Sequence, residues 1–542
     1  MNIRYPDVIS VFTENDCYSV SGKGYISKED VSVSAALVEK TLNICLVADQ
    51  TPVRYIKLHW TFGKNEKRND SVKVYGDVWE RGYGDLEWRG NAPDRMMPWV
   101  CAVSNGSDLD RNYEGRFTEC FGVKTQPNAM CFWQYDTSGI TLWLDVRCGG
   151  CGVILEGRKL SVCEVLFSEY RNISAFDALR KYYKSLCQNK LSADHKIYGS
   201  NNWYYAYGKT SHSDVIDDTE LIVKLCSENE NKPYMVIDDG WEKNGCDAPW
   251  DVLKDGKFYD MQELAKEISQ KGARPGIWLR PLSDRKFEVF NANAEQRSGK
   301  DSKFLDPSHP DVLEYVRKTI EMICGWGYEL IKHDFTTYDA LGFWGFERKE
   351  NFADDGWHFW NRKKTTAEIF IDLYKVIYEA SKNKAVILGC NVIGHLAAGL
   401  VHANRTGDDT SGYDWERVRK YGVNTLAFRM LHHGAFYEGD VDCVGIMGKI
   451  DWQLNHEWLK AVSRSGTAMF VSPNPRIIST EEKEELREAY KFGAAQKDVL
   501  IPLDWMENIC PEKWELNGTE ITFNWYPKDG INSFRPVNRR KQ

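Results

Sequence analysis

Residues 328–334 read YELIKHD, an apolar run that ends in a carboxylate, and seven similar runs lie between residues 197 and 472. They are IYGSNNWYY (197–205), PYMVID (233–238), ARPGIWL (273–279), KAVILGC (384–390), VHANRT (401–406), AFYEG (435–439) and GTAMFVS (466–472). Short apolar runs bounded by polar residues are typical of buried strands. Eight such strands are the number that a (β/α)8 TIM barrel requires.

Amphipathic stretches separate these runs, and the sequence predicts helices at residues 260–271, 310–325, 365–382, 413–431 and 452–465. Strands that alternate with helices indicate an α/β fold with a parallel sheet. A doubly wound open sheet would alternate in the same way. However, no Gly-rich phosphate loop follows any of the runs, so the pattern favours the barrel.

The two ends of the chain have a different pattern. Runs such as VSVSAALVE and ITLWLDV alternate with period two, so residues 1–190 are expected to form an N-terminal antiparallel β-sandwich. The barrel is then expected over residues 191–500. Residues 501–542 include TEITFNWY after an Asn517-Gly518 turn, which predicts a short C-terminal β extension.

Composition limits the partners and the compartment. The net charge of −9 is spread along the chain without a block of Lys and Arg, which argues against a nucleic-acid partner. The absence of a signal-peptide pattern and of a run of roughly 20 apolar residues predicts a cytoplasmic protein without a membrane partner. Fifteen cysteines without a regular framework fit reduced thiols. The lone pair Cys148 and Cys151 is expected in a Gly-rich hairpin turn, not in a metal or redox site.

Carboxylates cluster where the predicted strands end. Asp334 ends YELIKHD, and Lys332 points to the same side because side chains alternate along a strand. The ammonium would hold the pKa of the carboxyl down and keep it ionised, as a nucleophile requires. The alternative is a buried structural Lys–Asp pair.

A second cluster follows the sixth run, where Asp408 and Asp409 are adjacent and come shortly after Arg405. Neighbouring carboxylates raise each other's pKa, so one of them could stay protonated as a general acid. Arg405 could hold the other through a bidentate contact. The alternative is a turn and a helix N-cap, since Asp, Thr and Ser are common there.

A third cluster is IDDGWEKNG (237–245), which contains Asp238, Asp239 and Trp241. Two adjacent carboxylates can accept hydrogen bonds from two hydroxyls of one sugar while an aromatic ring covers its apolar face. Taken alone, the string is also compatible with an ordinary acidic turn.

Together these segments resemble the clan of retaining α-glycosidases that includes glycoside hydrolase families 27, 31 and 36. Family 36 α-galactosidases (melibiases) are the most similar. The resemblance covers roughly residues 197–475 and rests on motifs in the same order: NNWYYAYG (201–208), VIDDGW (236–241), GARPGIWLRP (272–281), LDPSHPDVLEYV (305–316), LIKHDF (330–335) and RTGDDTSGYDW (405–415).

The resemblance implies an enzyme that hydrolyses O-glycosyl bonds of terminal α-linked galactose by double displacement. It implies Asp334 as nucleophile and Asp408 as acid/base, with Asp409 as the alternative. It further implies that Asp238 and Asp239 hold the C4 and C6 hydroxyls of the sugar. The remaining pocket residues would be Trp203, Trp241, Trp278, Lys332 and Arg405.

The resemblance implies no cofactor and no metal, an α-galactoside oligosaccharide as substrate, and leaves a homo-oligomer open. The acidic and histidine-rich stretch LHHGAFYEGDVD (431–442) is accordingly expected to be the seventh strand and its loop, not a metal site. The aromatic insertion at residues 344–361 is expected to roof the pocket or to contact the leaving group.

Two kinds of alternative function remain. The same scaffold could act on an α-N-acetylgalactosaminide or an α-glucoside, or transfer the sugar to another sugar. An alternative of another class is a non-catalytic carbohydrate-binding protein, which the presence of both predicted catalytic carboxylates disfavours.

Overall fold

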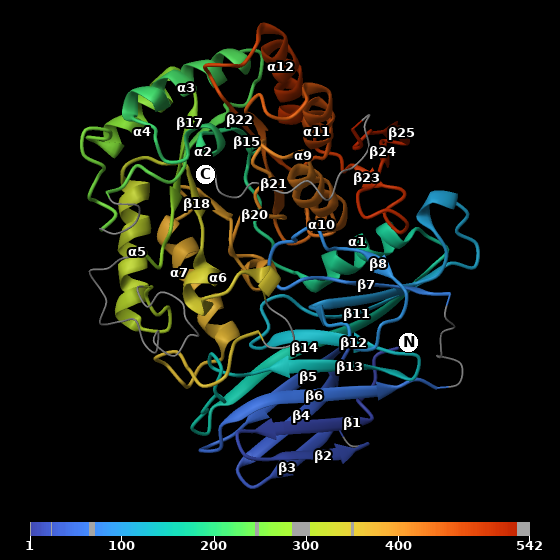
Figure 1. Cartoon of the computed structure of the whole chain (residues 1–542). Helices are drawn as coiled ribbons and strands as arrows, with labels where there is room; N and C mark the ends of the chain where they lie inside the picture. Colours follow the sequence, from blue (N-terminus) through green and yellow to red (C-terminus); the bar gives the residue numbers. More distant parts are fainter. Residues whose placement is uncertain are drawn as a thin grey trace.

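The computed structural model describes residues 2–22, 24–63, 71–243, 249–283, 304–347 and 352–527. A β-sandwich (blue to cyan) lies beside a barrel surrounded by helices (green to orange), and a small red sheet follows the barrel (Figure 1). This arrangement confirms the predicted TIM barrel with an N-terminal sandwich and a C-terminal β extension.

The sandwich consists of two antiparallel sheets. One has the strand order β2-β1-β6-β13-β12-β9, and the other has the order β3-β4-β5-β14-β11-β10-β7-β8. Along β5 (Thr41–Val47), buried and half-buried residues alternate, as expected for a strand with one face on the core. The other strands are β1 (Val8–Thr13), β2 (Cys17–Ser21), β3 (Tyr25–Lys28), β4 (Val31–Val38), β6 (Val53–Thr61), β7 (Lys73–Gly76), β8 (Trp88–Arg89), β9 (Met97–Pro98), β10 (Val100–Ser104), β11 (Phe117–Val123), β12 (Met130–Tyr135), β13 (Gly139–Asp145) and β14 (Lys159–Arg171).

Eight parallel strands close the barrel in chain order. They are β15 (Tyr198–Asn201), β16 (Tyr234–Ile237), β17 (Arg274–Leu279), β18 (Leu330–His333), β19 (Val386–Gly389), β20 (Ala403–Arg405), β21 (Glu438–Ile446) and β22 (Ala468–Pro473). All eight overlap the predicted runs, but the seventh prediction was misplaced, because β21 begins at Glu438 and extends to Ile446. Its acidic residues interrupt the apolar pattern, and its register shifts between Asp440 and Cys443.

Most predicted helices lie outside the barrel within one or two residues of their expected ends (Figure 1). They are α4 (Met261–Lys271), α5 (Pro310–Gly325), α7 (Thr366–Ser381) and α11 (Trp452–Arg464). The chain also contains α1 (Ala175–Leu186), α3 (His212–Leu225) and α12 (Thr480–Ala495). Local signals set their ends. For example, Asp260 accepts hydrogen bonds from the first turn of α4, and Thr365 and Glu368 form a capping box on α7.

The helix predicted at residues 413–431 is not continuous. The segment contains α9 (Trp415–Arg417), a π-helical stretch (Val418–Asn424) and α10 (Thr425–Arg429). Gly422 lies in the π-helical stretch, where an added Cβ would come within 2.9 Å of the Trp458 ring of α11. Close packing against this indole accompanies the departure from regular α-helix.

Three antiparallel strands, β23 (Ile501–Pro502), β24 (Lys513–Leu516) and β25 (Thr519–Thr522), form the C-terminal sheet. This extension is tied to the sandwich, since the Trp505 indole N–H donates to the buried Asp108 carboxylate at 2.9 Å. Asp108 also accepts the backbone N–H groups of Ala175 and Phe176 at the start of α1.

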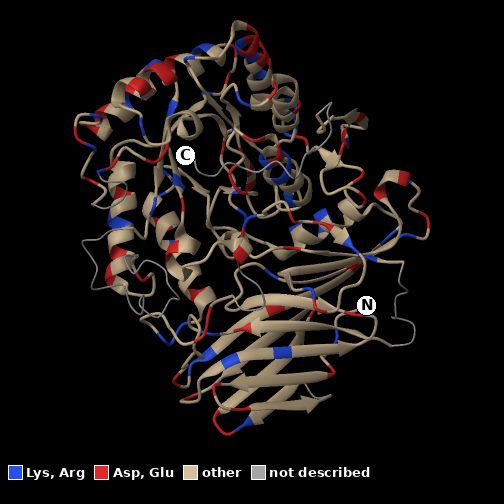
Figure 2. Cartoon of the chain, viewed as in Figure 1, with Lys and Arg blue, Asp and Glu red and all other residues tan. Residues whose placement is uncertain are grey.

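Acidic and basic residues are mixed along the outer helices (Figure 2). Within the described parts of the chain, no helix is long and apolar enough to cross a bilayer. Fourteen cysteines lie in these parts, and all are free thiols. The backbones of Cys148 and Cys151 form an isolated antiparallel β-bridge, which confirms the predicted hairpin turn.

Candidate active site

The inward faces of the barrel strands explain how residues distant in sequence meet. Val236, Leu330, Leu388 and Ala403 belong to one buried apolar cluster inside the barrel. Because side chains alternate along a strand, the next inward positions toward the carboxyl ends are those of polar residues. These positions are Asp238, Lys332, Cys390 and Arg405, followed on β18 by Asp334. The carboxyl ends of barrel strands are the face where such enzymes carry their chemistry.

Asp334 follows β18 directly and is held on both carboxylate oxygens. Its Oδ1 accepts the backbone N–H of Phe335 at 2.7 Å, and its Oδ2 accepts the indole N–H of Trp278 at 3.3 Å. Phe335 has a φ of 60°, in the left-handed region that is unfavourable for a residue with a Cβ. Strained backbone conformations of this kind cluster at functional sites.

Lys332 lies close to Asp334, but its ion pair is with Asp238, at 2.7 Å between Nζ and Oδ2. The alternative of a structural Lys332–Asp334 pair was therefore wrong, although the charge of Asp334 does act on Lys332. The same Asp238 oxygen accepts the amide of Asn201 at 2.7 Å. The second strand thus supplies the counter-charge for Lys332, and Trp278 is the side-chain donor to Asp334.

Asp239, the neighbour of Asp238, is in a different state. Burial, with the hydrogen bond and the charge of Glu242, raises the pKa of Asp239 to about 8. Its carboxyl is therefore protonated near neutral pH and can donate as well as accept a hydrogen bond.

Arg405, at the end of the sixth barrel strand, forms ion pairs with two carboxylates. It contacts Asp409 at 3.1 Å and Asp442 of β21 at 3.1 Å. Burial alone would raise the pKa of Asp409, but Arg405 and then Arg81 outweigh it, and the pKa is lowered to about 2. The prediction that neighbouring carboxylates raise each other's pKa was wrong for Asp409, since arginines dominate its surroundings.

Asp408 forms its ion pairs with Arg81 and Arg417. Its Oδ1 is 2.8 Å from a guanidinium nitrogen of Arg81, and its Oδ2 is 3.5 Å from Arg417. The alternative that residues 408–411 are a helix cap was wrong, because the next helix is capped by Asp414. The loop is held instead by Asp442, which accepts the backbone N–H and hydroxyl of Thr410 at 2.8 and 3.1 Å.

The Cys390 thiol lies near both Arg405 and Arg81. Its sulfur lies 3.5 Å from Arg405 and 3.9 Å from Arg81. Burial, and then the charge of Asp334, raises the pKa of this thiol. Arg405 and Arg81, which pair with Asp409 and Asp408, therefore contact one buried sulfur on which the charge of Asp334 also acts.

The three predicted tryptophans differ in their exposure. Trp278 and Trp241 are almost completely buried, and the Trp241 indole donates to the Trp278 carbonyl at 3.1 Å. Trp241 thus contacts the backbone of Trp278. Trp203 is half-buried and packs against Tyr207, with ring centroids 5.1 Å apart.

Several residues of this site were missed from the sequence. Glu80 and Arg81 come from the sandwich, and no motif in the neighbouring sequence marks them as site residues. Asp442 lies in the stretch that was expected to be the seventh strand and its loop, and it was not predicted as a site residue. The alternation of Glu438, Asp440 and Asp442 could have placed these residues on one face of a strand. Burial raises the pKa of Asp440 to about 6.

The histidines of the 431–442 stretch serve the fold. His432 pairs with Asp77 of the sandwich at 2.8 Å, and the His433 ring nitrogen Nδ1 accepts the backbone N–H of Gly439 at 3.1 Å. Among the described residues, no group of three His, Cys, Asp or Glu side chains is arranged to hold a metal ion. Part of the predicted aromatic insertion, residues 348–351, lies outside the described residues.

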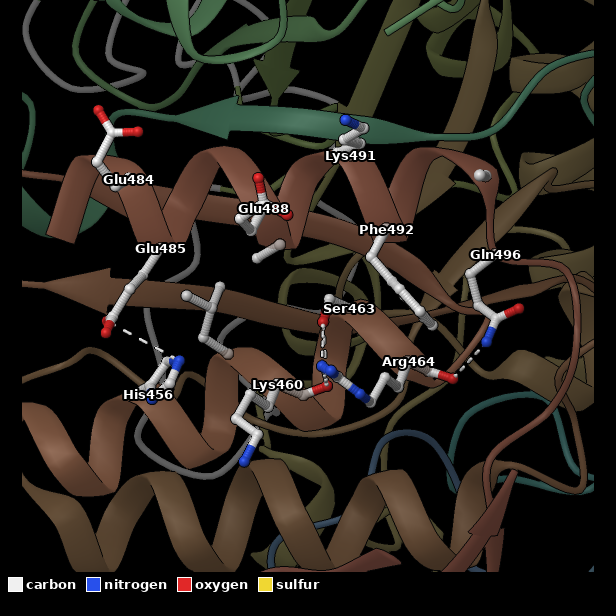
Figure 3. Close-up of a pocket in the computed structure, with 13 residues that line it drawn as sticks. His456, Lys460, Ser463, Arg464, Glu484, Glu485, Glu488, Lys491, Phe492 and Gln496 are labelled. Carbon is white, nitrogen blue, oxygen red and sulfur yellow. Dashed lines mark hydrogen bonds and ion pairs between the residues drawn. The ribbon is translucent and has the colours of Figure 1, made fainter. Parts of the chain in front are cut away.

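Two cavities differ in size and position. A cavity of about 10 Å³, the space of one water molecule, lies inside the barrel between Lys332, Arg405, Asp440 and Asp442. A groove of about 830 Å³ lies between α11 and α12 on the outside of the barrel (Figure 3). Its charged and apolar lining contains none of the predicted site residues, so its size does not make it the reactive centre.

No protein-family profile matches the sequence. The fold is similar to that of an α-galactosidase from Thermus thermophilus in complex with p-nitrophenyl α-D-galactopyranoside, with a TM-score of 0.58 and 15% identity over 91% of this chain and 96% of that one. It is also similar to family 36 α-galactosidase AgaA of Geobacillus stearothermophilus. A complex of that protein with stachyose gives a TM-score of 0.62 and 13% identity, over 94% of this chain and 79% of the other. A second complex, with 1-deoxygalactonojirimycin, gives 0.60 and 14%, over 94% and 71%. The expected resemblance to family 36 α-galactosidases is confirmed at the level of the fold.

Proposed function

We propose that the protein is a retaining glycoside hydrolase that removes terminal α-linked galactose from oligosaccharides. One observation carries the proposal. Asp334 is fixed by Trp278 and Phe335 at the barrel mouth, and its charge acts on the Cys390 thiol. Arg405 and Arg81 contact the same thiol and pair with Asp409 and Asp408 of the sixth-strand loop. Two carboxyl groups at one reaction centre are what glycoside hydrolysis requires.

In the first step Asp334 attacks C1 of the sugar while Asp408 gives its proton to the leaving oxygen, which yields a glycosyl ester on Asp334. In the second step Asp408 takes a proton from water, which attacks C1 and releases Asp334. Asp409 is disfavoured as the proton donor, because a carboxyl with a pKa of about 2 is ionised near neutral pH.

The substrate side of the proposal rests on the second-strand carboxylates. Asp238 is paired with Lys332, while the raised pKa of Asp239 lets its carboxyl donate a hydrogen bond, so the two can accept from and donate to neighbouring sugar hydroxyls. The solved structures with the same fold contain galactosides, which supports galactose as the glycone.

The test uses p-nitrophenyl α-galactoside with the wild type, Asp334→Ala and the surface control Glu314→Ala. We expect the control to retain full turnover and Asp334→Ala to lose it. We also expect proton NMR to show α-galactose as the first product, because two inversions restore the configuration. A variant that keeps more than a few per cent of activity would remove Asp334 from the role, and β-galactose as first product would exclude retention. Turnover of only another nitrophenyl α-glycoside would change the glycone, and binding of galactose without any product would favour a non-catalytic protein.

A further inference from the structure

The sandwich reaches into the barrel mouth through residues 77–87, between β7 and β8. Within this segment, Gly82 pairs with Gly407 of the sixth-strand loop. The N–H of Gly82 donates to the Thr406 carbonyl at 2.8 Å, and the N–H of Asp408 donates to the Gly82 carbonyl at 3.1 Å. The backbone of Asp408 is therefore positioned by a residue of the sandwich.

The same segment is fixed on its other side by Glu80, which is buried. Its Oε1 accepts the backbone N–H of Gly345 at 2.8 Å and the hydroxyl of Tyr83 at 2.6 Å, and its carboxylate accepts the Asn391 amide at 3.3 Å. An added Cβ at Gly82 would come within 2.9 Å of Thr425, so the fit against the barrel is close. This anchoring holds the residue between Glu80 and Gly82 in one place.

That residue is Arg81, and its side chain is 6% exposed. One guanidinium nitrogen lies 2.8 Å from Oδ1 of Asp408, another lies 3.9 Å from the Cys390 sulfur, and Nε donates to the Tyr83 hydroxyl at 3.3 Å. The guanidinium also lies over the rings of Tyr83 and Trp344, at 5.6 and 5.8 Å from their centroids. Arg417, the other partner of Asp408, is 39% exposed and more distant, at 3.5 Å. Arg81 is thus the buried, rigidly held cation of the pair.

We propose that Arg81 is the positioning residue of the acid/base Asp408, so that the sandwich completes the catalytic site of the barrel. The inference rests on the proposed function. When Asp408 gives its proton to the leaving oxygen, its carboxylate becomes negative, and the buried guanidinium stabilises that charge where it forms. Arg81 also holds the Asp408 side chain toward the leaving group, while Glu80 and Gly82 hold Arg81.

The test compares two substrates that differ in their need for an acid. Methyl α-galactoside has a poor leaving group, which must be protonated, whereas fluoride leaves from α-galactosyl fluoride with little protonation. The variants are Arg81→Gln and Arg81→Lys. The matched control is Arg158→Gln, which also breaks a sandwich-to-barrel ion pair, with Glu368 of α7 at 2.8 Å, away from the site.

For Arg81→Gln we expect kcat/KM for methyl α-galactoside to fall by about 100-fold, within the range of general acid catalysis, and that for the fluoride to change by less than about 3-fold. The loss should lie in kcat more than in KM. Arg81→Lys, which keeps a cation but not the planar guanidinium, should lose less than Arg81→Gln, and the control should match the wild type on both substrates.

Equal losses on the two substrates, or no loss on either, would overturn the role of Arg81. If Arg81→Gln does not fold, as judged by its thermal transition, Arg81→Lys alone decides, since a selective loss on methyl α-galactoside supports the role and an unselective one contradicts it. A wild type that hydrolyses neither substrate contradicts the proposed function itself, which distinguishes the two failures.

Discussion

At the scale of single residues, the site holds similar carboxylates in different states. Asp409 faces Arg405 and Arg81 and has a pKa lowered to about 2, whereas Asp239 is half-buried against Glu242 and has a pKa raised to about 8. Environments that separate the pKa values of neighbouring acids allow one site to contain both anions and proton donors. Asp442, which pairs with Arg405, has a φ of 72°, in the strained left-handed region.

The raised pKa of Asp239 predicts a pH effect on stability. In the unfolded chain this carboxyl titrates near pH 4. Between about pH 4 and pH 8 the unfolded chain is therefore ionised at this position while the folded protein is not, so the contribution of Asp239 to stability falls as the pH rises through this window. Asp239→Asn cannot ionise. We expect its melting temperature, relative to the wild type, to rise from pH 5 to pH 8 and to level off above pH 8. A difference that stays constant with pH would contradict this state of Asp239.

At the scale of the elements, the interrupted helix at residues 415–429 depends on a glycine. In Gly422→Ala the new methyl group would meet the buried indole of Trp458, and we expect a loss of about 1–3 kcal/mol from overpacking. Gly325→Ala is the control, because an added Cβ at the end of α5 meets no atom within 4 Å. Thermal unfolding of both variants checks this. Equal melting temperatures would show that the contact with Trp458 is not tight.

The element scale also shows what the sequence could predict. All eight strands were recognised, since each is a short apolar run, and α5 was placed residue by residue because Pro310 marks its start. β21 was misplaced because its buried acidic residues look like a loop. The broken helix was missed because its segment packs closely against Trp458, which lies 36 positions after Gly422 in the sequence.

The candidate site was also predicted only in part. Asp238, Lys332, Asp334 and Arg405 stand at strand ends, where the alternation of a strand foretells that they converge. Arg81 and Glu80 could not be found this way, because they reach the site through the packing of the sandwich on the barrel. The partner of Lys332 was also missed, since strand order and register decide whether Asp238 or Asp334 is nearer.

At the scale of the whole molecule, the sandwich and the barrel share buried charges. Asp77 is the first residue of the segment that carries Arg81, and it pairs with Arg429 at 3.3 Å and His432 at 2.8 Å, while the Tyr183 hydroxyl donates to it at 3.1 Å. Although burial alone would raise the pKa of Asp77, Arg429 and His432 outweigh it and lower the pKa. The two parts are therefore joined by an interface that depends on charge pairing.

In Asp77→Ala, Arg429 would remain buried without this partner, and we expect a loss of about 3–5 kcal/mol of unfolding free energy. The control is Glu263→Ala, which removes an exposed ion pair with Lys266 and should cost at most about 1 kcal/mol. Urea unfolding measures both. Similar small losses in the two variants would show that the shared charges do not hold the sandwich to the barrel.

The measurement that tests the central claim most directly is covalent labelling of the nucleophile. A 2-deoxy-2,2-difluoro α-galactoside with an activated leaving group should form an ester that hydrolyses slowly, and peptide mass spectrometry then locates the sugar. The account predicts one sugar per chain, on the peptide that contains Asp334, and no label in Asp334→Ala. A label on Asp408, Asp409 or Asp238, or turnover without any label, would contradict it.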